Sequence, residues 1–361
     1  MQTIINIIVF LLILGSIITI HELGHFLAAK FFGVYCDQFS IGFGPKIWSK
    51  KGKETEYELR LLPFGGFVAM AGEEDQLENE NMKDVPIERT LKGIKTYKKV
   101  IIFLAGVFMN FVLGISVLFM VNVFMGEINV NVAQIGTIAE GSAAETYQLQ
   151  VGDIIQKIDV EETGQTFLIS QYNDIILDKT TIKTDLDTIT LNVTVERNNE
   201  IKIIPMKVNY KDSNKIYEIG ITPARRSMTF LEACQYTWLN FVEMAVAVFT
   251  ALSQLVTHFT KTVTQLSGPA GIYQVTAEIT ESGQISYIFS LLALLSINVG
   301  VFNLMPIPGL DGCQVLFAVV EGIIGNELPQ KLKLTLQMIG LGLVLLLMAF
   351  VTCQDILRIM G

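Results

Sequence analysis

Five consecutive residues near the start of the chain, His21-Glu22-Leu23-Gly24-His25, form an H-E-x-x-H motif. On a helix, residues four apart lie on one face, so the two imidazoles can point at the same metal ion. Zinc accepts such nitrogens at about 2.0–2.1 Å and leaves room for a third ligand and a water molecule. The glutamate beside the first histidine is placed to take a proton from that water. The motif therefore predicts a hydrolytic zinc centre, with His21 and His25 as ligands and Glu22 as the general base.

The motif follows an apolar run, residues 4–20, and this setting indicates a membrane. The 361-residue chain is 51% hydrophobic and only 17% charged, and its mean hydropathy is +0.48. These values exclude an ordinary water-soluble protein and indicate several membrane-spanning segments. The formal net charge of −9 argues against nucleic acid as a partner. The four cysteines are scattered, so no disulfide framework is indicated.

Changes in composition divide the chain into six predicted regions. We expect a polytopic α-helical membrane protein with about four transmembrane helices, a membrane-associated β-hairpin or sheet region, and an inserted extracytoplasmic β-rich domain. The regions are transmembrane helix 1 at 1–30, a cytoplasmic or membrane-associated β region at 31–97, transmembrane helix 2 at 98–125, the β-rich domain at 126–222, an interfacial helical region at 223–282, and transmembrane helices 3 and 4 at 283–361. Asn198-Asn199 predicts a hairpin turn in the β-rich domain.

The distribution of lysines sets the expected orientation of the first helix. No Lys or Arg precedes Lys30, whereas further lysines follow at 46, 50, 51 and 53. By the positive-inside rule, the N-terminus lies outside and the H-E-x-x-H end lies near the cytoplasm.

The third metal ligand has two candidates from the residues alone. Histidine is scarce, so the ligand is His258 or a carboxylate. Asp311 follows two prolines in a segment that must break a helix, and an ionisable residue at membrane depth is presumed functional. An aspartate at the membrane surface is also a common helix cap. If residues 228–260 lie on the surface, Asp311 returns to the level of the two histidines; if they span the membrane, it lies at the opposite face. His258 is expected at the surface.

Together, the H-E-x-x-H motif and the segment N-L-M-P-I-P-G-L-D-G at 303–312 resemble the site-2 protease family of intramembrane zinc metalloproteases, in its RseP/RasP type. The likeness covers most of the chain, including Gly42–Pro45 and the stretch Ser142–Ile158, which is similar to part of a PDZ domain. The resemblance implies Zn2+ held by His21, His25 and Asp311, with Glu22 as the base. It also implies substrate-binding roles for Asn303, Pro306, Pro308, Gly65, Gly66 and Phe67. The β-rich domain is expected to be a single PDZ-like domain that gates access from outside.

The resemblance also implies partners and a location. Members of this family cut the transmembrane segments of single-span substrates, such as anti-sigma factors and cleaved signal peptides, within a bacterial inner or plasma membrane. Membrane lipid is the other expected partner. One departure is Cys313-Gln314 after L-D-G, where many relatives have Gly-His. That histidine is not a zinc ligand in the family, so the departure does not indicate an inactive enzyme.

Two other functions are compatible with the same residues. A membrane zinc-binding or transport protein would use the ligands for binding alone, but transporters usually show an inverted repeat and polar residues on several helices. An inactive scaffold would use only the PDZ-like domain, and the intact set of four site residues argues against it.

Overall fold

The computed structural model describes residues 2–73, 82, 84–129, 132–175, 177–211, 215–258 and 268–360. The chain divides into two compact units, one made of residues 1–124 and 232–361 and the other of residues 125–231. We call them the membrane unit and the inserted unit.

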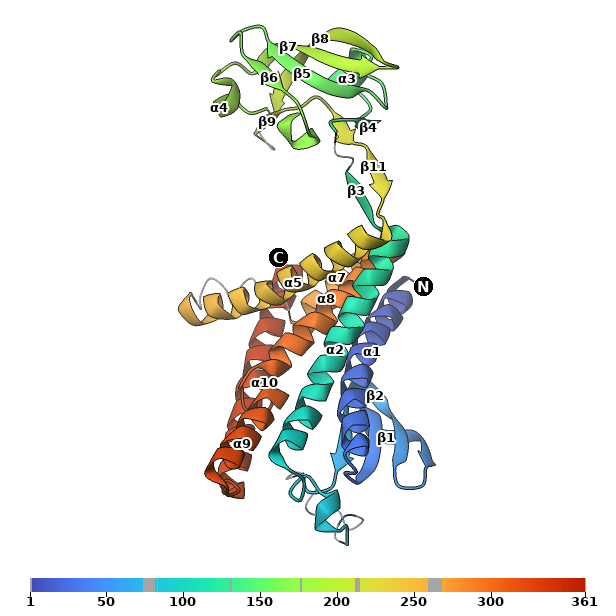
Figure 1. The fold of residues 1–361 in the computed structure, drawn as a ribbon, viewed down its shortest axis with the longest axis vertical. Coiled ribbons are helices and arrows are strands. Elements are labelled where there is room, and N and C mark those ends of the chain that lie inside the picture. The colour runs from blue at the N-terminus through green and yellow to red at the C-terminus, as the bar shows by residue number, and fades with distance from the viewer. Residues whose placement is uncertain are drawn as a thin grey trace. The chain divides into compact units, whose positions relative to one another are not determined.

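The membrane unit is built mainly from helices. They are α1 (Gln2–Phe31), η3 (Ile87–Arg89), α2 (Thr96–Met125), α5 (Phe230–Thr257), α7 (Pro269–Glu281), α8 (Ile285–Leu304), α9 (Asp311–Ile324) and α10 (Gln330–Met360). Among the described residues, five helices are long and apolar enough to cross a membrane, namely α1, α2, α5, α8 and α10. This confirms the prediction of a polytopic helical membrane protein. In Figure 1, α1, α2, α8 and α10 run alongside one another, whereas α5 crosses them steeply near one end.

Apolar side chains and buried amides hold α2, α5 and α8 together. Val117, Val248 and Ile297 belong to one buried cluster that joins the three helices. Within it, the Asn122 side chain donates a hydrogen bond of 2.9 Å to the Thr237 hydroxyl. A polar side chain inside a membrane bundle needs such a partner, because lipid offers none.

Two long strands, β1 (Cys36–Lys51) and β2 (Glu56–Met70), form a bent antiparallel hairpin beside α1 (Figure 1). Because both strands bend back, residues 38–41 of β1 pair with 66–69 on one side and with 56–59 on the other. Residues 46–51 then pair with the opposite edge of 56–60. The segment 66–70 is therefore an edge of this small sheet, and it pairs with only one strand among the described residues. Gly66 lies within this edge.

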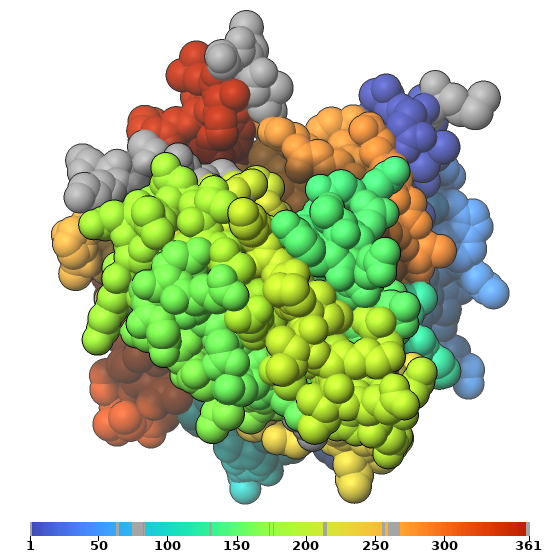
Figure 2. All heavy atoms as spheres, turned by 90° about the horizontal axis from the view of Figure 1, so that it is seen from above, coloured from blue at the N-terminus to red at the C-terminus, as the bar shows by residue number. Residues whose placement is uncertain are grey.

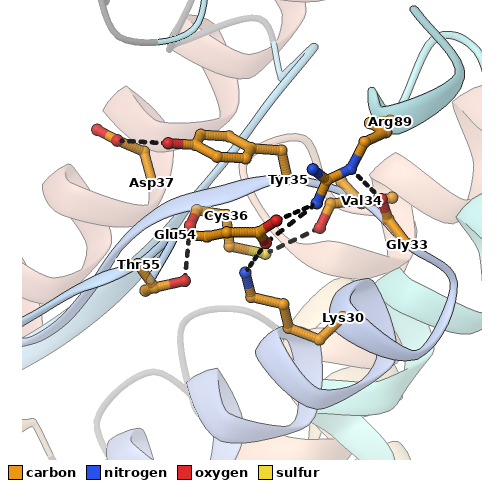
Figure 3. A network of polar contacts seen from close by, with 9 residues as sticks. All are labelled: Lys30, Gly33, Val34, Tyr35, Cys36, Asp37, Glu54, Thr55 and Arg89. Atoms are coloured by element: carbon orange, nitrogen blue, oxygen red, sulfur yellow. Dashed lines mark hydrogen bonds and ion pairs between the residues drawn. The ribbon is translucent and has the colours of Figure 1, made fainter. Parts of the chain in front are cut away.

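A polar network fastens this hairpin to the end of α1 (Figure 3). Glu54, in the hairpin turn, accepts a hydrogen bond of 2.9 Å from Lys30 of α1 and forms an ion pair of 2.9 Å with Arg89. Arg89 Nε also donates to the Gly33 carbonyl at 3.2 Å. The hydrogen bonds from Lys30 and then Arg89 lower the pKa of Glu54 below its usual value, so it is charged at neutral pH. The network fixes the hairpin, and with it the edge 66–70, relative to α1.

The inserted unit is a β-rich body. Its elements are β3 (Glu127–Asn129), β4 (Ile135–Ile138), α3 (Ala143–Thr146), β5 (Ile154–Val160), β6 (Thr166–Leu168), η4 (Tyr172–Ile175), α4 (Lys179–Ile182), β7 (Thr188–Arg197), β8 (Glu200–Lys211), β9 (Ile216–Tyr217), β10 (Ile221–Pro223) and β11 (Arg225–Ser227). Five strands form one antiparallel sheet in the order β6-β5-β7-β8-β9. Figure 2 shows the atoms of this unit, in green to yellow-green, packed as one body.

Alternation along β7 explains the core of the inserted unit. Ile189, Leu191 and Val193 have no exposed surface, while the residues between them point outward, as the period of two in a strand requires. Asn198 and Asn199 have φ angles of +52° and +65° and form the two-residue turn between β7 and β8. This confirms the predicted hairpin turn, because a type I′ turn needs positive φ at both central residues.

Candidate metal centre

The three candidate zinc ligands lie on two helices, α1 and α9. His21 and His25 lie one turn apart on α1, and both are buried. Asp311 is the first residue of α9, directly after the proline-containing break that follows α8. A side chain at Gly312 would collide with the carbonyl oxygens of Leu304 and Met305, at 2.4 and 2.3 Å. The glycine therefore lets the end of α8 touch the start of α9, and this contact sets the position of Asp311.

Three donor atoms converge at this point. His21 Nε2 lies 3.0 Å from Asp311 Oδ2, His25 Nε2 lies 3.3 Å from the same oxygen, and the two nitrogens are 3.2 Å apart. A tetrahedral zinc ion with bonds of about 2.0–2.1 Å requires ligand atoms about 3.3–3.4 Å apart. The observed separations therefore match a zinc site closely.

The second nitrogen of each imidazole has a partner that fixes the ring. His25 Nδ1 lies 2.8 Å from the Ile102 carbonyl and so must carry the proton, which leaves Nε2 free to bind metal. His21 Nδ1 lies 3.1 Å from the Asn110 amide nitrogen, while the Asn110 Oδ1 atom is buried without a hydrogen bond. The two ends of an amide are exchanged by a simple flip. The flipped amide accepts a hydrogen bond from the N–H at His21 Nδ1, and the Nε2 atom of His21 is then free to bind metal.

Asp311 adds independent support for a cation at this site. Its Oδ2 atom is buried and receives no hydrogen bond of acceptable geometry from any residue that the structure describes, although both imidazole nitrogens lie nearby. A buried carboxylate oxygen in this state requires a positive charge. Two neutral imidazoles and one carboxylate are a common ligand set of catalytic zinc sites. The residues present therefore fit zinc.

Glu22 faces the same pocket, next to the edge of the hairpin. A pocket of about 320 Å3 is lined by Glu22, His25 and Asp311, together with residues of β2, α9 and α10. A side chain at Gly66 would lie 3.1 Å from Glu22 Cγ and 2.8 Å from the Ser40 carbonyl. The absence of a side chain at Gly66 thus brings the β2 edge directly beside Glu22.

The predicted substrate-binding residues are not all gathered here. Asn303 reaches the metal centre, with its amide nitrogen 3.5 Å from His21 Nε2. Gly66 and Phe67 line the pocket, and Gly65 has a φ of +91° that suits glycine. The two prolines do not line the pocket: Pro306 is exposed, and the Pro308 backbone packs against Gly340 of α10. His258 is exposed at the end of α5, as expected of a surface histidine.

Several residues of the site escaped the sequence analysis. Gly106 of α2 lies directly against both histidine rings, and Asn110 follows it by four residues on the same face. In the sequence, these two residues are marked only as a glycine and an asparagine one helical turn apart within an apolar run. Gln314 of α9 and Gln337 of α10 also line the pocket. Gln314 is notable in the sequence only as a departure from the family motif, and only the polarity of Gln337 within an apolar helix could have indicated its place.

The fold and the site define a metallohydrolase whose centre lies within a bundle of apolar helices. The chain belongs to peptidase family M50, whose sequence pattern matches residues 9–347. It is 30% identical over 431 aligned residues to the regulator of sigma-W protease RasP of Bacillus subtilis, an alignment that covers 98% of this chain and 99% of the relative. The zinc metalloprotease RasP of Bacillus licheniformis is 27% identical over 439 residues, with the same coverage. A Fusobacterium nucleatum protein that is named as a candidate zinc metalloprotease, FN1322, is 32% identical over 353 residues, covering 96% of this chain and 97% of that protein.

These similarities confirm the predicted function. The chain is a zinc-dependent intramembrane metalloprotease of the site-2 protease RseP/RasP type, which serves regulated intramembrane proteolysis. It is a multi-pass membrane protein.

Proposed function

We propose that the chain cuts the transmembrane segment of single-span membrane proteins at a zinc centre held by His21, His25 and Asp311, with Glu22 as general base. One observation carries the proposal: the three ligand atoms lie within 3.0–3.3 Å of one another beside a pocket that Glu22 also lines. When bound, zinc polarises a carbonyl and lowers the pKa of a bound water toward about 7. Glu22 would accept a proton from the attacking water and pass it to the leaving amine.

The edge of β2 is the proposed docking strand for the substrate. A peptide bond inside a helix has a hydrogen-bonded carbonyl and a shielded backbone, so the substrate must unwind before it is cut. The backbone groups exposed by unwinding cost several kcal/mol each in lipid. Pairing with the outer edge of residues 66–69, next to the Met70 N–H that donates to Glu73, satisfies one side of the unwound stretch, as an added strand does in other peptide complexes. Gly66 brings this strand within reach of Glu22.

Asn303 is proposed to orient the substrate or its reacting carbonyl. Its amide is 3.5 Å from His21 Nε2, so it can donate a hydrogen bond to an oxygen that develops charge at the metal. For Pro306 and Pro308 we propose an indirect role, since they shape the break before Asp311 and lie outside the pocket lining.

For the membrane topology we propose four spans, α1, α2, α8 and α10, with α5 at the outer interface among lipid headgroups. The steep crossing of α5 in Figure 1 supports this arrangement. We further propose that the N-terminus lies outside and the active site near the cytoplasm of a bacterial cell membrane. The lysines that follow α1 and precede α2 support this orientation. We propose that the inserted unit is a PDZ-like domain that limits access from outside; its short helix α3 followed by strand β5 supports this.

The proposed substrates are membrane-anchored regulators such as anti-sigma factors, and remnant signal peptides. The name of the Bacillus subtilis relative, a regulator of sigma-W, supports the first of these. Both kinds of substrate present a single apolar segment, which suits a pocket enclosed by helices.

The test is cleavage of a synthetic single-span peptide by the purified protein in detergent. We expect Glu22→Gln to retain zinc and lose cleavage by at least about 100-fold, because it removes the general base. Glu243→Gln, at an exposed position of α5, is the matched control and should cleave normally. Asp311→Ala should lose zinc. Full cleavage by Glu22→Gln would refute the mechanism, and zinc uptake into vesicles without any cleavage would favour a transporter.

A further inference from the structure

The catalytic pocket has two walls of different character. One wall is the backbone edge of β2, with Gly66 and Phe67, and the other is formed by α9 and α10. Most of the helical wall is apolar, including Leu334, Met338 and Leu341. Two glutamines interrupt it, Gln314 from α9 and Gln337 from α10. Within the described lining of the pocket they are the polar side chains that carry no charge at any pH.

The described part of the chain satisfies neither glutamine amide. Both side chains are partly buried, and among the described residues neither has a hydrogen-bond partner. Gln314 lies three residues after Asp311 on α9, so it shares the face of the metal ligand. Neither amide is fully buried, so both are open to the pocket. Two such amides on one wall are placed to hydrogen-bond a polar ligand that enters the pocket.

An extended peptide supplies the groups these amides lack. A strand presents N–H and C=O groups along both of its edges, and β2 can satisfy only one edge. The other edge of a bound substrate faces α9 and α10, where unpaired backbone groups would be costly. A glutamine amide both donates and accepts, which matches the alternating N–H and C=O groups of a backbone.

We infer that Gln314 and Gln337 hydrogen-bond the unwound substrate backbone on the side opposite β2, and that they are substrate-positioning residues of this protease. This inference rests on the proposed function of the pocket. Recognition is then of the backbone and not of a particular side chain. Any apolar helix that unwinds at this depth is a substrate, whereas one that stays helical keeps its backbone groups paired internally and gains nothing from the two amides.

The first experiment measures kcat and KM for a single-span peptide with Gln314→Met, Gln337→Met and the double variant. Methionine keeps the size and flexibility of the side chain and removes its hydrogen bonds. A net hydrogen bond of about 0.5–1.5 kcal/mol predicts a rise in KM of about 2- to 12-fold per variant, with kcat and zinc content unchanged. Gln330→Met, also on α10 but outside the pocket lining, is the matched control.

The second experiment pairs each enzyme variant with a substrate in which one backbone amide near the scissile bond is replaced by an ester. The ester removes an N–H donor and weakens the neighbouring acceptor. At the position that faces a glutamine, the ester should raise KM for the unmodified enzyme and have little further effect in the corresponding methionine variant. Equal ester effects in all enzymes, at every position tested, would overturn the inference and leave the amides to bind water or to pack. If the unmodified enzyme cuts no peptide at all, the proposed function itself fails, and the two failures are thus distinguishable.

Discussion

Gly106→Ala should disable the metal centre without unfolding the protein. A Cβ atom at this position would lie 2.3 Å from His25 Nε2 and 2.8 Å from His21 Cε1. Ordinary contact between such atoms begins at 3.4 Å, so the His25 ring must shift by 3.4 − 2.3 = 1.1 Å. A retreat of helix α2 would open the close contact between Gly24 of α1 and the Ala105 backbone, where a Cβ atom would lie 2.3 Å from the carbonyl oxygen.

A shift of this size exceeds what a zinc site accepts, since ligand distances vary by only about 0.2 Å. Even the loss of an outer partner of a ligand lowers metal affinity by about 10- to 100-fold, so we expect at least this loss for Gly106→Ala, which is about 1.4–2.7 kcal/mol. The assay is zinc titration of the purified protein against a chromophoric chelator, with cleavage of a single-span peptide as the second readout.

The matched control is Gly15→Ala. Gly15 lies on α1, the helix that carries the two histidines, and a Cβ atom there would have no described neighbour within 4 Å. This variant should bind zinc normally and gain slightly in helix stability, by up to about 1 kcal/mol. The reasoning is refuted if Gly106→Ala binds zinc as tightly as Gly15→Ala, since the two histidines would then tolerate a displacement that the geometry forbids.

Three further outcomes follow from side-chain contacts, one at the metal centre and two in the inserted unit. Asn110→Leu removes the partner of His21 and should weaken zinc binding by about 10- to 100-fold, as measured by the same titration, while helix content by circular dichroism stays unchanged. Arg197→Met leaves the 1% exposed Asp153 without the two 2.7 Å bonds from the guanidinium, and should destabilise the inserted unit by about 3–5 kcal/mol in hydrogen-exchange measurements on the full chain. Asp178 caps α4, and hydrogen bonds from the Thr180 hydroxyl and the Thr181 N–H lower its pKa to about 2. Because the folded pKa lies below the ordinary value of 3.8, this stabilisation is complete above pH 3.8 and is lost as the pH falls toward 2. The protection factor of the Thr181 amide against hydrogen exchange should therefore fall in that window and stay constant between pH 5 and 7.

The helical architecture could be predicted because lipid imposes a simple rule on sequence. A segment that spans the bilayer must be long and apolar, and α1, α2, α8 and α10 satisfy this without interruption. The turn at Asn198-Asn199 was equally predictable, because few residues accept positive φ twice in succession. The double pairing of β1 was not predictable. It depends on a bend that brings residues 56–59 and 66–69 to opposite sides of one strand, and no local pattern encodes that.

The site divides in the same way between local and distant contacts. His21, Glu22 and His25 are visible because their spacing is that of a helix turn. Partners on other helices are not visible, because packing and not spacing brings them together: the Asn110 amide beside His21, and Gln337 across the pocket. An asparagine in an apolar run needs a partner, but the run itself cannot say that the partner of Asn110 is an imidazole.

The pairing of β3 with β11 has a consequence for how this protein can change. Glu127, Ile128 and Asn129 lie opposite Ser227, Arg226 and Arg225, so the chain enters and leaves the inserted unit through one two-stranded ribbon. Strand partners are only about 5 Å apart, which a two-residue turn can bridge. The whole insert is thus a cassette that could be excised, exchanged or duplicated by joining Asn129 to Arg225, with no cut inside any catalytic helix. A chain closed in this way would show which activities belong to the membrane-embedded peptidase alone.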